Sequence, residues 1–247
     1  MSADRLLDIY ALMERVDRER TTGFALCEVA TRFMALDGAG IALIGDDQDL
    51  TSLCTSNQTS EALMDLELTL GEGPAFDASL GSANEEADLL RSTTSKWSTY
   101  GPQAVELGAR AVFGYPVRFG AVRFGALSLY RNDPGSLNSA QSSDAYLMAS
   151  VVSRSILGLQ AGGSHESVVG ELGGASNIDF RSHQAAGMLA IQGSMSVKDG
   201  LVALRAHAFG AGSLISDLAE RVITGATRFD LESREWLNEP TDGIGGR

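Results

Sequence analysis

Residues 111–131 read AVFGYPVRFGAVRFGALSLYR, and this stretch decides the fold class of the first part of the chain. Two apolar runs, Ala111–Phe119 and Gly125–Tyr130, are separated by the turn-forming residues 120–123. Short runs rich in aromatic and branched residues, joined through a glycine-containing turn, are typical of a β-hairpin. We therefore expect an antiparallel sheet here, and Asn132–Gly135 is expected to end it.

A second hairpin is predicted upstream of the first. Gly40–Ile44 is an apolar run closed by the turn Gly45-Asp46-Asp47, and Leu50–Thr55 is its expected partner strand. Leu70–Pro74 has the composition of a loop. Apolar residues at helical spacing predict helices over residues 6–16, 24–34, 61–66, 97–107 and 144–159. Helices packed against antiparallel hairpins make an α+β fold.

The organisation of the chain follows from a change in composition. Residues 161–177 contain five glycines, which is typical of a linker. We therefore expect a first domain over residues 1–160, a linker over 161–177, a small three-helix bundle over 178–230, and a partly disordered tail over 231–247.

Within the predicted bundle, the first helix is expected over residues 178–192. Ser196 and Asp199 form a capping-box pattern that opens the second helix, and Ser213 is the expected N-cap of the third. Three helices of this length are enough for a small bundle with a shared apolar core.

The net charge of −13 argues against broad, non-specific binding to nucleic acid. Its distribution is uneven, because residues 1–162 hold 12 basic and 21 acidic residues, whereas residues 171–230 hold 5 and 6. The acidity therefore belongs to the first domain, and a local basic face remains open in the second. The sequence Glu85-Glu86 with Asp88 is interpreted as a solvated acidic loop.

Localisation is inferred from what the sequence lacks. It has no run of about 20 apolar residues and no secretory signal, so we expect a cytoplasmic protein that does not span a membrane. Cys27 and Cys54 do not form a CxxC pair, and a disulfide is rare in that compartment. We interpret them as two small buried residues rather than as a disulfide.

Enzymatic activity is not expected. The three histidines, His165, His183 and His207, all lie outside the first domain, which excludes a Ser-His-Asp triad or a histidine-based metal site there. Paired acids at Asp46-Asp47 are also typical of phosphoacceptor receiver domains, but the lysine on a later strand is missing. Carboxylate-based catalysis is the remaining enzymatic alternative, although no two acids have the spacing of an acid–base pair.

Several motifs of the first domain resemble the GAF domain of GAF–ANTAR regulators. They are Gly71-Glu72-Gly73-Pro74, Trp97, Tyr100, residues 107–116 and residues 125–131. The C-terminal segment is similar to an ANTAR domain. The residues that carry this second resemblance are Gln184–Leu189, Ser196, Ala203-Leu204-Arg205, Ala208, Asp217-Leu218-Ala219 and Val222-Ile223.

The resemblance implies a signal-responsive regulator. GAF domains bind small molecules or act as dimerising sensor scaffolds, and ANTAR domains bind paired hairpins in nascent RNA so that transcription continues past a terminator. We therefore expect nascent RNA hairpins as partners, a homodimer, and a small-molecule effector of unknown class. No cofactor is assigned, and Ala75 stands where relatives often carry a cysteine after the Gly-Glu-Gly-Pro loop.

Two sets of side chains are candidate sites. An RNA hairpin requires cations for its phosphates and a low surface that loop bases can approach, and the candidate RNA-binding residues are Arg181, Gln184, Met188, Lys198, Arg205 and His207. The alternative is that these are ordinary solvated charges beside a close helix contact. The candidate ligand-pocket residues are Phe76, Trp97, Tyr100, Phe113, Tyr115 and Tyr130, and the alternative is that they belong to the core.

The C-terminal segment departs from the ANTAR pattern in its charges. Ala186 stands where the family usually has a lysine, and residues 212–216 lack the usual basic cluster. Each phosphate contact that is lost removes part of the affinity. The alternative function is therefore a ligand-sensing or protein-interaction dimer whose ANTAR-like domain no longer binds RNA.

Overall fold

The computed structural model describes residues 3–19, 26–45, 49–91, 96–160, 177–230 and 235–238. The chain divides into two units, Met1–Ser176 and Asn177–Arg247, which are described separately. The predicted linker over residues 161–176, the turn at Asp46-Asp47, His165 and the tail beyond Asn238 lie outside the described residues.

The first unit is built on a five-stranded sheet in which every pair of neighbours is antiparallel. The strand order is β2-β1-β5-β4-β3. The strands are β1 (Gly38–Ile44), β2 (Leu50–Thr55), β3 (Asn84–Glu86), β4 (Ala111–Phe119) and β5 (Val122–Arg131). The strands of both predicted hairpins are confirmed, and the turn between β4 and β5 is tighter than predicted because β5 begins at Val122. The predicted acidic loop at Glu85-Glu86 is wrong, because these residues form the short edge strand β3.

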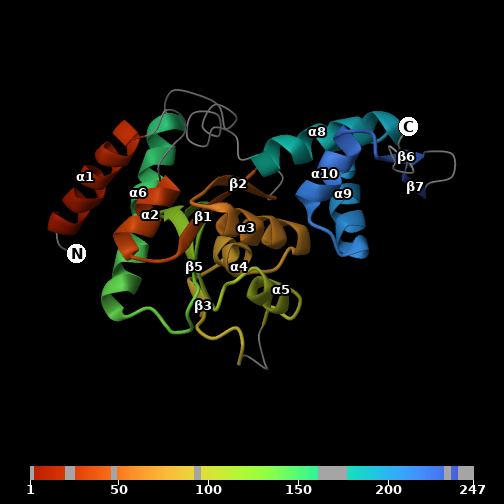
Figure 1. Cartoon of the computed structure of the whole chain (residues 1–247). Coiled ribbons are helices and arrows are strands. Elements are labelled where there is room, and N and C mark those ends of the chain that lie inside the picture. Colours follow the sequence, from red (N-terminus) through yellow and green to blue (C-terminus); the bar gives the residue numbers. More distant parts are fainter. Residues whose placement is uncertain are drawn as a thin grey trace, which may run out of the picture. The chain divides into compact units, whose positions relative to one another are not determined.

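Helices cover both faces of this sheet (Figure 1). One face packs against α2 (Leu26–Met34) and α6 (Ser139–Gln160), and α1 (Ala3–Glu19) packs on these two helices. The other face packs against α3 (Gln58–Leu70) and α4 (Pro74–Leu80), and α5 (Tyr100–Glu106) packs on α3. Because successive side chains of a strand point to opposite faces, Phe113, Tyr115 and Val117 join the core with α2 and α6. Gly114 instead lies against the backbone carbonyl of Pro74. An α+β architecture is thus confirmed for this unit.

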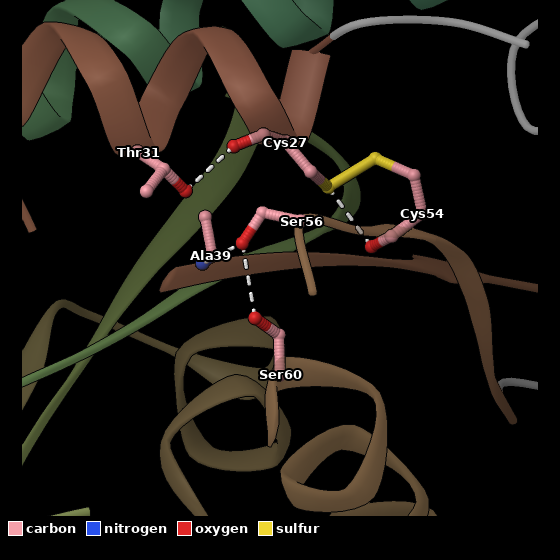
Figure 2. The surroundings of a disulfide bond; sticks show 6 residues. All are labelled: Cys27, Thr31, Ala39, Cys54, Ser56 and Ser60. Carbon is pink, nitrogen blue, oxygen red and sulfur yellow. Dashed lines mark hydrogen bonds between the residues drawn. A yellow bond between two sulfur atoms is a disulfide. The ribbon is translucent and has the colours of Figure 1, made fainter. Parts of the chain in front are cut away.

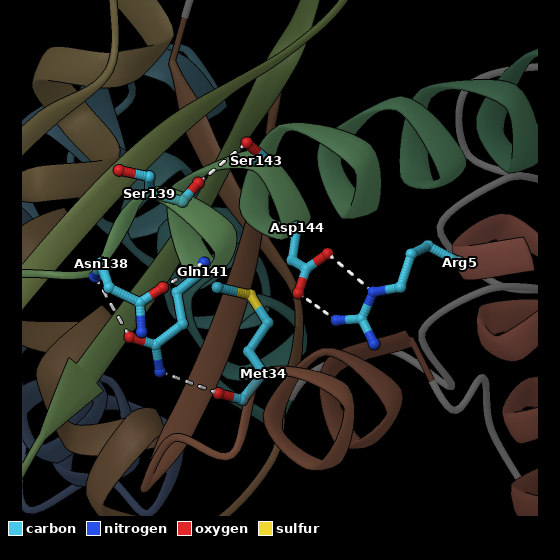
Figure 3. A network of polar contacts seen from close by, with 7 residues as sticks. All are labelled: Arg5, Met34, Asn138, Ser139, Gln141, Ser143 and Asp144. Atoms are coloured by element: carbon cyan, nitrogen blue, oxygen red, sulfur yellow. Dashed lines mark hydrogen bonds and ion pairs between the residues drawn. The ribbon is translucent and has the colours of Figure 1, made fainter. Parts of the chain in front are cut away.

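The loop after the sheet and the ends of three helices are joined by polar contacts (Figure 3). Arg5 of α1 forms a two-point ion pair with Asp144 of α6, and its guanidinium lies 4.3 Å from the ring centroid of Phe33 in α2. The amide group of Gln141 donates to the carbonyl of Met34 at 3.4 Å and accepts from Arg131 at 2.9 Å. These contacts fasten the three helices of one face to each other and to β5.

The expectation that the two cysteines are unpaired is wrong. Cys27 of α2 and Cys54 of β2 form a disulfide (Figure 2). Both side chains belong to the core between the sheet and α2. The pairing depends on how α2 crosses the sheet, and sequence spacing carries no information about that crossing.

Within residues 177–230 and 235–238, the second unit contains three helices and a short hairpin. The helices are α8 (Asn177–Gln192), α9 (Val197–Ala211) and α10 (Ile215–Ile223), and the hairpin is formed by β6 (Thr227–Asp230) and β7 (Glu235–Asn238). The core of this unit consists of Ala185, Leu189, Leu204, Ala208, Ile215, Leu218, Ala219 and Val222. Phe229 and Trp236 of the hairpin pack against it, so residues 235–238 form a strand within the region predicted to be a partly disordered tail.

Ser196 caps α9 as predicted, because its hydroxyl accepts from the backbone N–H of Asp199 at 3.1 Å and donates to the Asp199 carboxylate at 2.6 Å. The predicted cap of α10 is wrong by one residue. Leu214 occupies the N-cap position, and no side chain provides the cap.

Candidate functional site

The Gly-Glu-Gly-Pro segment connects two helices directly, whereas the sequence predicted a simple loop. Helix α3 ends at Gly71, whose N–H donates to the carbonyl of Glu67 at 2.9 Å, and Pro74 is the first residue of α4. A Cβ atom at Gly73 would lie 2.5–2.8 Å from the side chain of Glu67. The absence of a side chain at this position is therefore what allows the Glu67 carboxylate to reach the start of α4.

Glu67 caps α4 from outside that helix. Its Oε2 accepts hydrogen bonds from the backbone N–H groups of Ala75 at 2.6 Å and Phe76 at 3.3 Å, and its Oε1 accepts from the hydroxyl of Ser128 at 3.1 Å. A helix begins with N–H groups that have no partner within the helix, and a carboxylate satisfies them well. Gly73 cannot cap α4 itself, so Glu67 takes that role.

Burial, together with the negative charge of Asp77, raises the pKa of Glu67 to about 8. The three hydrogen bonds to Ala75, Phe76 and Ser128 act in the opposite direction because they favour the charged form. A fully buried carboxyl with a pKa near neutrality is the strongest electrostatic feature of this face of the sheet.

Glu72 caps the start of α5, as Glu67 caps the start of α4. Its Oε1 accepts from the backbone N–H groups of Thr99 and Tyr100, both at 2.5 Å. Nearby, the indole N–H of Trp97 donates to Asp77 at 2.9 Å. Lys96 pairs with the same carboxylate at 3.1 Å. Three residues that carry the GAF resemblance, Glu72, Trp97 and Tyr100, thus take part in polar contacts near the starts of α4 and α5.

The six candidate pocket aromatics do not lie together. Phe113 and Tyr115 point into the core beneath α2 and α6, where Tyr115 contacts Tyr146 edge-to-face at 5.0 Å. Tyr130 points to the opposite face, where its hydroxyl donates to Asn57 at 3.2 Å. The structure therefore divides the predicted pocket between two faces of the sheet.

The other three candidates come from the elements on the second face. Trp97 and Tyr100 are fully buried and meet edge-to-face with ring centroids 5.9 Å apart, while Phe76 on α4 is half-buried. Among the described residues, the Tyr100 hydroxyl has no hydrogen-bond partner. Burial and the neighbouring charge of Glu67 raise the pKa of Tyr100, so this hydroxyl stays neutral and can donate. It is the candidate contact for a polar group of an effector.

In the second unit, two of the candidate cations share a face of α9. An α-helix turns by about 100° per residue. Around the axis of α9, the positions of Lys198, Arg205 and the exposed Phe209 therefore fall within about 40° of one another. Phe209 is 58% exposed, and Val202, on the same side, is 55% exposed. Apolar side chains flanked by cations therefore form one row, defined here as the α9 stripe: Lys198, Val202, Arg205 and Phe209.

His207 does not belong to this stripe. It is two residues beyond Arg205, which places it about 200° away around the helix. Its ring stacks on Trp236 of β7, with ring centroids 4.2 Å apart and planes at 9°. Burial and the positive charge of Arg221 lower the pKa of His207. This histidine holds the hairpin against α9.

The candidates on α8 are divided as well. Arg181 pairs with Glu220 of α10 at 3.1 Å, and Met188 packs against the core of the unit. Gln184 is exposed, as is Ile191, one of the most exposed apolar side chains described at 84%. Around the axis of α8, the positions of Gln184, Met188 and Ile191 fall within about 60° of one another, so these three residues share one side of the helix.

Sequence reasoning missed the roles of Glu67, Glu72, Val202 and Phe209. The signal for the last two was present, because they recur at helical spacing with Lys198 and Arg205, away from the leucines of α9. Among the described residues, no group of three or more His, Cys, Asp or Glu side chains could hold a metal ion. No described helix is both long and apolar enough to cross a membrane.

Comparison with known proteins gives structural similarity without close sequence relatives. The sequence matches no family model and no curated protein. Among solved structures, a GAF domain of a phosphoenolpyruvate-protein phosphotransferase from Acinetobacter matches at 15% identity, covering 67% of this chain and 99% of that one, with a TM-score of 0.48. The GAF domain of the corresponding Coxiella burnetii protein matches at 13% identity, covering 63% and 96%, with a TM-score of 0.47.

A third match is a domain of a two-component sensor histidine kinase protein from Sinorhizobium meliloti. It is 16% identical, covers 56% of this chain and 89% of that domain, and has a TM-score of 0.47.

Proposed function

We propose that the chain is a signal-responsive cytoplasmic regulator that acts in transcription antitermination. In this proposal the first unit is a GAF-like domain that senses a small molecule or dimerises, and the second is an ANTAR-like unit that binds paired RNA hairpins. The chain performs no catalysis itself. The observation that carries the proposal is the α9 stripe, which the motif resemblance to GAF–ANTAR regulators places in the output unit.

The chemistry of the α9 stripe suits a single-stranded hairpin loop. Arginine and lysine contact phosphates, while exposed aromatic rings stack on bases that are not paired. Lys198 and Arg205 supply the first kind of contact and Phe209 the second. Because the unit carries few cations, one copy alone should bind weakly, and a dimer that engages two hairpins gains from effective concentration.

The test is a gel-shift titration of the full-length protein with a tandem-hairpin RNA at low salt. Replacing both cations, Lys198→Gln with Arg205→Gln, should weaken binding by about tenfold or more and reduce the slope of log affinity against log salt by up to about two. Phe209→Ala should weaken binding with little change in that slope, because it removes stacking and no charge.

Arg228→Gln is the matched control, since Arg228 is an exposed cation of the same unit that lies on β6 and not on α9. The proposal fails if Arg228→Gln weakens binding as much as the double substitution. It also fails if the folded wild-type protein shows no binding at low salt.

The alternative function is a ligand-sensing or protein-interaction dimer that has lost RNA binding. A specific observation favours it: Arg181 is paired with Glu220 and His207 is stacked on Trp236, so two of the candidate RNA contacts serve the fold. Analytical ultracentrifugation of Ile191→Ser, which removes the exposed apolar side chain of α8, distinguishes the two functions. Loss of a dimer together with unchanged, negligible RNA affinity would favour the alternative.

A further inference from the structure

Cys27 and Cys54 are the only two cysteines of the chain, and the fold brings them together across the core of the first unit. They are 27 residues apart in sequence, and their Cα atoms are 6.1 Å apart, a separation that suits a disulfide without movement of the backbone. One lies on helix α2 and the other on β2, an edge strand of the sheet. The bond therefore fastens a helix to a sheet edge.

The two cysteine residues differ in exposure. Cys27 is 1% exposed, whereas Cys54 is 9% exposed. The pairing of β1 with β2 is irregular beside Cys54, because Ile41 pairs with Cys54 but Ala42 pairs with Ser52. Such a bulge leaves one residue unpaired and changes the direction of nearby side chains. A small reagent therefore has better access to Cys54 than to Cys27.

The same site also accommodates the reduced state. The Sγ atom of Cys27 lies 2.9 Å from the carbonyl oxygen of Cys54, so the Cys27 thiol can donate a hydrogen bond to it once the disulfide is opened (Figure 2). The end of β2 is held independently of the sulfur atoms, because the hydroxyl of Ser56 accepts from the N–H of Ala39 at 2.9 Å and bonds to Ser60 at 3.0 Å. Both redox forms thus leave the sheet intact.

We propose that Cys54 and Cys27 are a reversible thiol–disulfide site that reports the state of the low-molecular-weight thiol pool to the first unit. The oxidant is a small disulfide. The Cys54 thiolate attacks one sulfur of that disulfide, forms a mixed disulfide and releases one small thiolate. The Cys27 thiolate then attacks the Cys54 sulfur, forms the Cys27–Cys54 bond and releases the second small thiolate.

The exchange is balanced in atoms and electrons. Two protein thiols are oxidised, one small disulfide is reduced to two small thiols, and each thiol proton passes to a released thiolate through solvent. The reverse sequence reduces the protein. Cys54 is the attacking residue because it is the accessible one, and Cys27 is the resolving residue.

The structural consequence falls on α2. This helix packs on the sheet through Val29 and Ala30 and shares one core with α6 residues such as Val151 and Val152. The disulfide ties the first turn of α2 to β2, so reduction releases that end while the packing remains. Oxidation thereby changes the rigidity of a helix that contacts α6.

The experiment uses the full-length protein equilibrated in buffers of oxidised and reduced glutathione, followed by acid quenching, alkylation of free thiols and mass spectrometry. We expect both cysteines to change together, and the reduced form to be recovered when reduced glutathione is in excess. Cysteines that stay as thiols in excess oxidised glutathione would overturn the proposal. A disulfide in the folded protein that excess reduced glutathione cannot open would overturn it too.

Two variants test the order of attack. Cys27→Ser leaves Cys54 without a resolving partner, so it should accumulate a glutathione adduct, whereas Cys54→Ser should form about tenfold less adduct because Cys27 is buried. Equal adduct on both variants, with circular dichroism showing both folded, contradicts the assigned roles.

Hydrogen exchange supplies a readout that does not depend on substitution. In the wild-type protein, reduction should speed exchange in peptides covering Leu26–Met34 by about tenfold or more. Peptides covering Gln58–Leu70 of α3, on the opposite face of the sheet, should be unaffected. Unchanged exchange in α2 would show that the disulfide does not alter this helix and would overturn the structural consequence.

Discussion

The two units of this chain differ in how deeply their helix-capping carboxylates are buried. In the first unit, Glu67 and Glu72 are turned inward and cap the helices α4 and α5, and a disulfide closes the other face of the sheet. In the second unit, polar and apolar residues share the surface, and Phe209 and Ile191 are exposed beside cations and amides. The acidic residues of the first unit are thus partly structural, whereas the exposed apolar residues of the second are not explained by its core.

This difference separates polar residues that the fold accounts for from exposed residues that it does not. A buried carboxylate that caps a helix is accounted for by the fold, so its presence alone does not indicate a ligand. An exposed aromatic side chain in line with two cations is not required by the fold of α9. The comparison therefore directs functional tests to the second unit and stability tests to the first.

The most severe test of the comparison is Gly114→Ala in the first unit. A Cβ atom at Gly114 would lie 2.1 Å from the carbonyl oxygen of Pro74, and this neighbour is backbone that cannot rotate away. We expect a loss of about 4 kcal/mol or more in the free energy of unfolding, because the close contact of α4 with β4 must open. Denaturant unfolding followed by circular dichroism measures it.

The matched control lies in the second unit. Gly187 is in the middle of α8, and a Cβ atom there would meet nothing within 4 Å. Gly187→Ala should leave stability unchanged or raise it by up to about 1 kcal/mol, since alanine favours a helix over glycine. If the two glycine variants had similar effects, the close contact of Gly114 with the Pro74 carbonyl would not limit the stability of the first unit.

The second prediction concerns the other face of the sheet. Because the disulfide joins residues 27 positions apart, its loss frees a long loop of the unfolded chain. We expect Cys27→Ser, or reduction of the wild-type protein, to lower the free energy of unfolding by about 3 kcal/mol. Denaturant titrations with and without reductant measure the effect. In Cys27→Ser the reductant should have no further effect, and a reductant effect in that variant would contradict the assignment.

The fold of the first unit was largely predictable because its strands have strong local signals. The hairpin at residues 111–131 combines β-forming residues with a glycine turn, and the opening helix has a clear apolar spacing. Strand β3 was not predictable, because Asn84–Glu86 is three residues long and polar. Helix α4 was not predicted either. Its place in the sheet comes from pairing with β4, which is a tertiary contact.

The site was predictable only in outline. The Gly-Glu-Gly-Pro motif drew attention to the right segment, but the partners of Glu72 lie 27 and 28 residues away, beyond the reach of spacing rules. Strand parity shows that Phe113 and Tyr115 share a face, yet separating them from Tyr130 requires the register between β4 and β5. The disulfide was missed for the same reason, since it depends on the packing of α2 on the sheet.

The third prediction tests whether the buried carboxyl of the first unit is a source of pH dependence. The pKa of Glu67 is raised from 4.5 to about 8. Between these values the folded state holds a proton that the unfolded state releases, so the contribution of Glu67 to stability is full below pH 4.5 and is lost as the pH rises through about 8. The slope contributed by Glu67 should reach about 1.4 kcal/mol per pH unit at most.

Glu67→Gln removes this titration while keeping a side chain that can accept from Ala75 and donate to Ser128. Unfolding measured at several pH values between 5 and 8 should show a flatter profile for this variant than for the wild-type protein. Glu106→Gln, at an exposed position on α5, is the control and should leave the profile unchanged. A variant profile parallel to that of the wild type would mean that Glu67 is already ionised in this range.

The smallest effect is expected in the second unit, at the stack of His207 on Trp236. Burial, and then the positive charge of Arg221, lower the pKa of His207 below its ordinary value of 6.5. The folded state therefore favours the neutral ring, so its contribution is present above pH 6.5 and is lost as the pH falls. Proton NMR of the three imidazoles, with the signal assigned through His207→Gln, measures the pKa directly.

A pKa of His207 at or above 6.5 would show that the hairpin does not shield the ring, and it would remove the structural role that separates His207 from the α9 stripe. Trp236→Ala sharpens the test, because it removes the stacked ring but no charge. The pKa of His207 should then rise toward 6.5 if burial is its main cause. If it does not move, the positive charge of Arg221 is the dominant cause of the lowered pKa.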